Sequence, residues 1–213
     1  SRVSKKETDS YLDRAEQALR KIIDSGNRDD FDSIDLGAMF LETEFKDLKS
    51  EEEKKAFRDL YALKMKQYAI ELKILKNSGP NPSNDDLIQE QMVKLNSDFT
   101  KNYAKADPSL TSLFRGLSAN CQASTKLNVS VLKKMQKLLA LYPDGKKVLA
   151  VQKFEEHVQA VIYDPEKKEV WDLMTGERTS EIRGPIYDIA EVVNAHLKGV
   201  GRSGFDSEKF LLA

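Results

Sequence analysis

The chain has few of the side chains on which thiol, imidazole and metal chemistry depend. Its 213 residues include one cysteine, Cys121, and two histidines, His157 and His196. A zinc site with two or three cysteines is therefore excluded within this chain, and a site of histidines alone would have only two ligands. A single cysteine also excludes an intramolecular disulfide. We therefore expect no metal, no cofactor and no disulfide scaffold.

Long hydrophobic runs and an excess of one charge are also missing. No apolar run approaches the roughly 18–20 residues that a membrane-spanning helix needs, so we expect no membrane span. Lysine and arginine number 34 against 35 aspartates and glutamates, which leaves a net charge of −1. Such a balance provides no global field to attract nucleic acid. With 40% apolar residues, the composition still permits a core in one large domain or two small ones.

The first half of the chain has the apolar periodicity of helices. Apolar residues recur at intervals of three and four through residues 4–23, 50–75 and 84–103, which predicts an apolar face on each of three helices. Ser50 is followed by three glutamates, and this pattern is typical of a helix start. We therefore expect residues 1–106 to form a helical region that could serve as a lid or a docking module.

The second half changes from a helical to an extended pattern. We expect it, as residues 107–213, to form the core of an α+β fold in which one helix packs against a short antiparallel sheet. The predicted elements are a helix over 121–141, strands over 147–151, 157–163 and 169–173, and a final helix over 186–197.

Three residues of this second half form a candidate catalytic set. Cys121 begins the predicted helix, where backbone N–H groups and the helix dipole favour a thiolate, which is the nucleophilic form. His157 begins the second strand and Asp172 lies on the third, so we expect them to be neighbours across a hairpin through a diagonal contact or a bulge. A carboxylate beside the imidazole would hold its tautomer and stabilise its protonated form. The sequence therefore predicts a Cys–His–Asp triad.

Each of these residues also has an ordinary structural explanation. A lone cysteine is commonly a small buried apolar residue, a histidine at a strand edge is commonly half-exposed, and Asp172 could be a strand residue that reaches a turn. His196 lies in the last turn of the predicted final helix, where a protonated imidazole would interact favourably with the helix dipole. We therefore give His196 no chemical role.

The order of these residues resembles the core of the transglutaminase-like, papain-like cysteine superfamily. In that family a cysteine heads a helix, a histidine begins a strand, and an aspartate lies on the next strand. The residues that carry the resemblance are Ala119-Asn120-Cys121-Gln122, His157-Val158-Gln159-Ala160-Val161-Ile162-Tyr163 and Val170-Trp171-Asp172-Leu173-Met174-Thr175-Gly176. The resemblance implies a papain-like or transglutaminase-like core that carries out acyl transfer through a thioester on Cys121.

The sequence departs from the family pattern beside the catalytic positions. Asn120 and Gln122 flank the cysteine where many members have glycine and an acidic or aromatic residue, and Leu173 stands where a proline often follows the aspartate. The glutamine that papain-like enzymes place before the cysteine is also missing. The oxyanion donors are therefore expected to be the backbone N–H of Cys121, with the side chain of Asn120 or Gln122 as a helper.

Three functions are compatible with these features. The leading prediction is a cysteine peptidase or a glutamine deamidase that acts on a protein or peptide substrate. A transglutaminase or another acyltransferase with an amine acceptor is the first alternative. The second is a non-catalytic helical interaction module on a degenerate core. Because the chain begins Ser1-Arg2-Val3, either a targeting segment was removed or the chain was shortened, and an extracytoplasmic or secreted location is one expectation.

Overall fold

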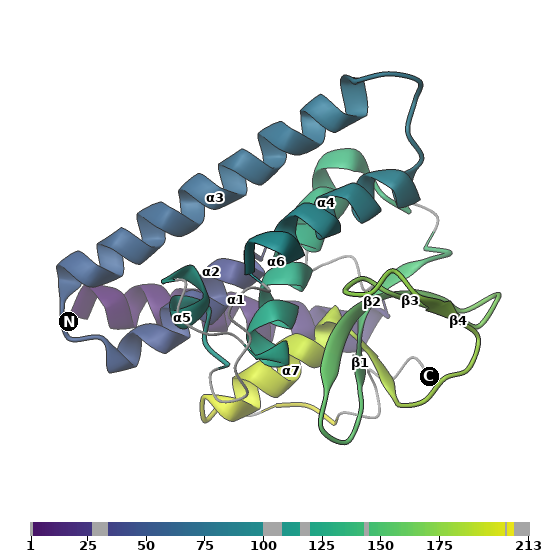
Figure 1. The fold of residues 1–213 in the computed structure, drawn as a ribbon. Coiled ribbons are helices and arrows are strands. Elements are labelled where there is room, and N and C mark those ends of the chain that lie inside the picture. The colour runs from purple at the N-terminus through teal and green to yellow at the C-terminus, as the bar shows by residue number, and fades with distance from the viewer. Residues whose placement is uncertain are drawn as a thin grey trace.

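Helices and one antiparallel sheet make up the structure. The computed structural model describes residues 2–26, 34–99, 108–115, 120–142, 145–202 and 204–206. The expected α+β class is confirmed by the mixture of helices with a single five-stranded sheet (Figure 1). The expected boundary between residues 106 and 107 lies outside the described residues.

The predicted helices and strands occur in the predicted order with shifted ends, and the structure adds two short strands that the sequence did not predict. The helices are α1 (Arg2–Ser25), α2 (Leu36–Glu44), the short 3-10 helix η2 (Phe45–Asp47), α3 (Glu51–Asn77), α4 (Asn84–Phe99), α5 (Leu110–Phe114), α6 (Cys121–Leu139) and α7 (Ile189–Gly199). The strands are β1 (Val148–Lys153), β2 (Val158–Asp164), β3 (Glu169–Asp172), β4 (Arg178–Thr179) and β5 (Ile186–Asp188). The predicted final helix thus starts as an edge strand, and Asp188 caps α7 by accepting a hydrogen bond from the Glu191 N–H.

The sheet has the order β4-β3-β2-β1-β5, and its two faces have different partners. On one face Ala160, Ile162 and Trp171 join the main hydrophobic core, which also contains the buried residues of α6. On the opposite face Val161 and Val170 belong to a smaller separate cluster. Strand residues alternate between these two faces, so register decides which side chains can meet α6.

Helices from the first half of the chain share the main core with the sheet. Buried side chains from every long helix, among them Leu19 of α1, Leu72 of α3 and Leu95 of α4, lie in the same cluster as Trp171 of β3. Helix α6 contacts α2, α3 and α4 as well as β1 and β2. In Figure 1 the long helix α3 lies on one side of the molecule and the sheet on the other, with α6 between them. Among the described helices, none combines the length and apolar composition needed to cross a bilayer.

Candidate functional site

Cys121 is the first residue of α6, as expected. Asn120 caps the helix: its Oδ1 accepts hydrogen bonds from the Gln122 N–H at 2.9 Å and the Ala123 N–H at 3.1 Å. The cysteine side chain is partly exposed and its thiol is free. The first-turn N–H groups of a helix give its start a partial positive charge, which stabilises negative charge developing on a nearby sulfur.

His157 is the last residue of the tight loop between β1 and β2, one position before β2 begins, whereas the sequence predicted it to be the first residue of that strand. Lys153 pairs with Val158, so residues 154–157 make the whole connection. The Phe154 N–H donates a hydrogen bond to the His157 carbonyl oxygen at 2.7 Å. The two rings stack, with centroids 6.0 Å apart and planes 21° from parallel. The imidazole is exposed, and one of its faces lies beside the phenyl ring.

A hydrogen bond between α6 and β2 brings the start of the helix close to this loop. Thr125 lies one turn after Cys121, and its Oγ1 donates to the carbonyl oxygen of Val158 at 3.3 Å. Residues four apart lie on one helix face, and Val158 directly follows His157. As a result Cys121 and His157 line the same cavity, whose volume is about 670 Å³. The lining also contains Phe40, Gln122, Lys126, Phe154, Glu155, Glu156, Tyr187, Glu191 and His196.

Cys121 and His157 share this cavity without a hydrogen bond between their side chains, both residues being in the part of the chain that the structure describes. A catalytic base must come within about 2.6–3.2 Å of the proton that it removes, but such contacts are often longer when no substrate is bound. The thiol of Cys121 and the imidazole of His157 therefore lie in one site, but they must come closer together before a proton can pass between them.

Asp172 is not brought to this cavity. Its partner across the hairpin is Val161, four residues along β2 from His157, a separation of about 13 Å at the usual strand rise. Val161 lies in the hydrophobic cluster on the sheet face opposite α6, so Asp172 points to that face as well. The expected diagonal contact with His157 is therefore absent, because the loop of residues 165–168 between β2 and β3 sets a different register.

The carboxylate of Asp172 is instead used within its own turn. Its Oδ1 accepts from the Met174 N–H at 2.8 Å and the Thr175 N–H at 3.4 Å, and its Oδ2 accepts from Thr175 Oγ1 at 3.0 Å. Gly176 follows with a φ of 76°, which favours glycine. These bonds satisfy a carboxylate next to an apolar strand and turn the chain from β3 to β4.

The expected oxyanion helpers have separate roles. Asn120 uses its side-chain oxygen to cap α6, so only its side-chain NH2 group could donate to an oxyanion. Gln122 is exposed and lines the cavity, so its side-chain amide is available there.

His196 is the site residue that sequence reasoning missed. Burial, followed by the nearby Lys126, lowers the pKa of its imidazole to about 4, so the ring is neutral at pH 7. Thr43 Oγ1 donates to the Phe40 carbonyl at 2.8 Å, so it accepts a hydrogen bond from the Nε2–H of His196 at 3.0 Å. The interpretation of His196 as a cation on a helix dipole is therefore wrong. The sequence around His196 gives no sign of this role, because the residues that contact its ring, Phe40 and Thr43, belong to α2.

Comparisons with known proteins do not identify a relative of this chain. A scan against protein-family models, a search of the curated proteins and a search of the solved structures each found no match. Within the described ranges, no group of three or more histidine, cysteine, aspartate or glutamate side chains is placed to hold a metal ion.

Proposed function

We propose that this chain is a cysteine-dependent acyl-transfer enzyme in which Cys121 is the nucleophile and His157 is the base. The observation that carries the proposal is their shared cavity: the cysteine heads α6, and the histidine ends the loop that α6 holds through the Thr125–Val158 hydrogen bond. A thiol, an imidazole and a helix start together are the parts that thioester chemistry requires. The proposal includes the papain-like or transglutaminase-like core that the sequence resembles.

The reaction is hydrolysis of an amide in a peptide or a glutamine side chain. His157 takes the thiol proton as the sulfur of Cys121 attacks the carbonyl carbon, and the carbonyl oxygen becomes an oxyanion that accepts a hydrogen bond from the backbone N–H of Cys121. The C–N bond then breaks, and the leaving amine takes the proton from His157. Water attacks the thioester with His157 as base, the C–S bond breaks, and the thiol is restored.

Orientation of the imidazole differs from the triad that the sequence predicts. Asp172 is occupied in its turn, and the neighbour of the His157 ring is the phenyl ring of Phe154 instead. The proposed machinery is thus a Cys121–His157 pair without Asp172.

The position of the Asp172 carboxylate, away from His157, also favours a second, non-catalytic function. A core of this kind without an orienting carboxylate fits a degenerate, non-catalytic interaction module, which was the alternative left open by the sequence. Thiol chemistry separates the two functions, because only an enzyme needs a reactive Cys121 that depends on His157.

The test is the rate at which iodoacetamide alkylates Cys121 at pH 6.5, followed by intact mass. We expect labelling at least tenfold faster than that of glutathione, and a fall to within about twofold of glutathione in the His157→Asn variant, because base assistance typically contributes a factor of 10²–10⁴. Asp172→Asn is the matched control and should label at the wild-type rate. A glutathione-like rate in the wild type, or no effect of His157→Asn, would remove the enzyme proposal in favour of the interaction module.

Turnover of a glutamine-containing peptide then identifies the reaction. Ammonia release with the peptide intact indicates a deamidase, a new amino terminus indicates a peptidase, and incorporation of an added primary amine indicates a transferase. Cys121→Ser should abolish each reaction and retain the wild-type melting temperature, because a partly exposed helix start accepts serine well.

A further inference from the structure

The outer face of helix α3 has an exposed apolar stripe. Among the described residues, five large apolar side chains are strongly exposed, and three of these lie on α3: Leu63 (53% exposed), Ile70 (48%) and Ile74 (60%). Because they are seven and four residues apart, they share one face of the helix. A single exposed apolar residue is ordinary on a protein surface, whereas a contiguous stripe is typical of an interaction site.

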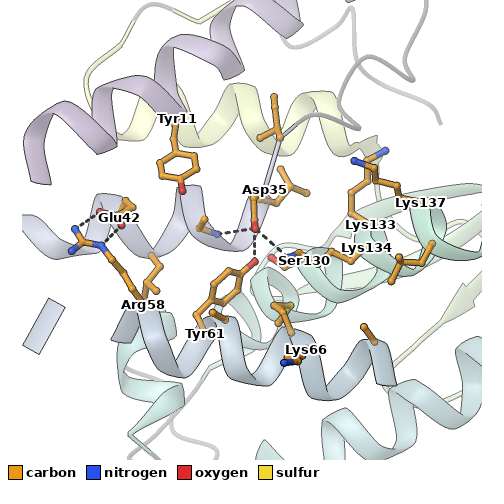
Figure 2. Close-up of a pocket in the computed structure, with 18 residues that line it drawn as sticks. Tyr11, Asp35, Glu42, Arg58, Tyr61, Lys66, Ser130, Lys133, Lys134 and Lys137 are labelled. Carbon is orange, nitrogen blue, oxygen red and sulfur yellow. Dashed lines mark hydrogen bonds and ion pairs between the residues drawn. The ribbon is translucent and has the colours of Figure 1, made fainter. Parts of the chain in front are cut away.

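This face points away from the rest of the molecule. The apolar and aromatic side chains by which α3 packs on the other helices are Phe57, Tyr61, Met65, Tyr68 and Leu72. Figure 2 shows one of them, Tyr61, pointing inward to the carboxylate of Asp35, with which it forms a hydrogen bond. Leu63 and Ile70 follow Tyr61 and Tyr68 by two residues, a rotation of about 200° on an α-helix, so they lie on the opposite side. In Figure 1 α3 lies at the edge of the molecule, which leaves that side open.

The exposed face repeats with the spacing of a coiled coil. Its positions alternate in steps of four and three, and we call them the α3 seam: Ala56, Leu60, Leu63, Gln67, Ile70, Ile74 and Asn77. Leu60 is half-buried and the other six are exposed. Apolar residues at this alternation, the a and d positions of a heptad, form the contact between two supercoiled helices. The α3 seam therefore has the pattern that fits a second helix over about three heptads.

Gln67 lies in the middle of the α3 seam at an a position, between Leu63 and Ile70. A single polar residue at an a position lowers the stability of a coiled coil but fixes its register, because the polar side chain is satisfied only opposite another polar group. When two identical helices run parallel, Gln67 of each copy lies opposite Gln67 of the other, and the two amides can hydrogen-bond to one another. The α3 seam therefore favours a second copy in register over an unrelated apolar helix.

Charged residues beside the α3 seam also fit a second copy. Lys66 precedes Gln67 and Glu71 follows Ile70, so they hold the g and e positions that border the seam on its two sides. In a parallel pair, the g residue of one helix lies beside the e residue five positions later on the other, which brings Lys66 of each copy next to Glu71 of the other. Neither side chain forms an ion pair or a hydrogen bond within the described residues. The two charges are therefore complementary across the seam and available for pairing.

The same residues disfavour an antiparallel pair. In an antiparallel coiled coil the g positions of the two helices face each other. If the apolar residues on both sides of Gln67 are matched, Lys66 lies beside either Lys73 or Lys66 of the second copy. Like charges placed side by side weaken such an association. The charge pattern therefore favours a parallel arrangement.

We propose that the chain forms a parallel dimer in which the α3 seams of two copies pack against each other. The interface is apolar at Leu63, Ile70 and Ile74, has the two Gln67 side chains at its centre, and is bordered on each side by a Lys66–Glu71 ion pair. Each α3 is already held as a helix by its inner face, so association does not carry the cost of helix formation that isolated coiled-coil peptides must meet. No residue of the α3 seam lines the cavity of Cys121, so the dimer and the chemistry of that cavity can be tested independently.

The test is sedimentation-velocity ultracentrifugation of the full chain between about 1 and 100 µM, a range in which a micromolar dimer changes its population. We expect the dimer fraction to rise with concentration. Leu63→Glu/Ile70→Glu places charges in the α3 seam and should raise the dissociation constant at least tenfold. The matched control is Val93→Glu/Leu138→Glu, which adds the same charges at the other two strongly exposed apolar residues and should dimerise like the wild type. Melting curves verify that each variant is folded.

Charge reversal tests the parallel arrangement. Lys66→Glu and Glu71→Lys each place like charges together at both borders of the α3 seam, so each variant alone should weaken the dimer several-fold. An equimolar mixture of the two variants should restore the wild-type affinity, because the mixed dimer pairs opposite charges at both borders.

The outcomes decide the proposal directly. A chain that stays monomeric across this range overturns it, because the α3 seam would then meet a different partner. A dimer that persists in Leu63→Glu/Ile70→Glu, or that is weakened equally in the control, also overturns it, because the interface would lie elsewhere. Unchanged or tighter association in Lys66→Glu overturns the parallel arrangement. Loss of the dimer in the seam variants alone, with recovery in the mixture, supports the proposal.

Discussion

At the scale of single residues, His196 shows how tertiary surroundings reset a side chain. Its position near the end of α7 indicates a cation, yet its ring packs edge-on against Phe40 with centroids 5.0 Å apart and donates to Thr43. Burial excludes the water that would solvate an imidazolium, and Lys126 repels it. The neutral ring therefore forms part of the cavity wall near Cys121.

The lowered pKa of His196 predicts a loss of stability in mild acid. The unfolded chain binds a proton near pH 6.5 and the folded chain only near pH 4, so the unfolded state holds more protons in that window. The stabilising contribution is full above pH 6.5 and is lost as the pH falls toward 4. The variant His196→Gln still forms a hydrogen bond but does not titrate. Between pH 7 and pH 4 we therefore expect the free energy of unfolding of the wild type to fall, relative to that of the variant, by on the order of 2–3 kcal/mol.

Urea unfolding of both proteins at several pH values measures this effect, because the carboxylates common to both cancel in the difference. A wild-type-minus-variant difference that stays constant from pH 7 to pH 4 would contradict the assignment of a buried neutral imidazole.

At the scale of elements, the turn after β3 depends on Asp172. Asp172→Ala removes acceptors for two N–H groups and one hydroxyl in that turn, and we expect it to lower the free energy of unfolding by about 1–2 kcal/mol. Asp172→Asn keeps one oxygen in place and should retain most of the stability.

Alkylation of Cys121 distinguishes this turn role from a catalytic one. Both Asp172 variants should be labelled at the wild-type rate, because the carboxylate belongs to the other face of the sheet. A labelling rate that falls in Asp172→Asn while the melting temperature is unchanged would instead restore the triad that the sequence predicts.

At the scale of the whole molecule, the two halves of the chain are held together at more than one place. Asp85, in the first turn of α4, accepts a hydrogen bond from the Tyr142 hydroxyl, and its carboxylate lies 3.3 Å from Lys147 Nζ and 3.1 Å from an Arg178 nitrogen. Arg178 in turn lies over the Trp171 ring, 4.1 Å from its centroid. These contacts supplement the shared hydrophobic core, so we expect the chain to unfold as one unit.

Cooperative unfolding can be measured directly, because the chain contains a single tryptophan, Trp171, which is buried in β3. The fluorescence of Trp171 therefore reports on the sheet alone. Leu19→Ala on α1 empties space in the shared core and should cost about 2–5 kcal/mol. We expect the helical signal in far-ultraviolet circular dichroism and the fluorescence of Trp171 to shift together to lower urea. A fluorescence transition that keeps its wild-type midpoint while the helical transition moves would indicate that the helices and the sheet unfold separately.

Sequence periodicity by itself determined the order of the long helices and of strands β1, β2 and β3, the α+β class and the position of Cys121 at a helix start, because these depend on local spacing and capping. It also placed His157 beside a strand, within one residue. Tertiary structure decided the rest. The register of β2 with β3 put Asp172 opposite Val161, and a shift in register changes which positions meet across a sheet. The packing of α7 on α2 placed His196 in a partly buried position beside Phe40 and Thr43. Such contacts join residues far apart in the chain, and no local pattern carries them.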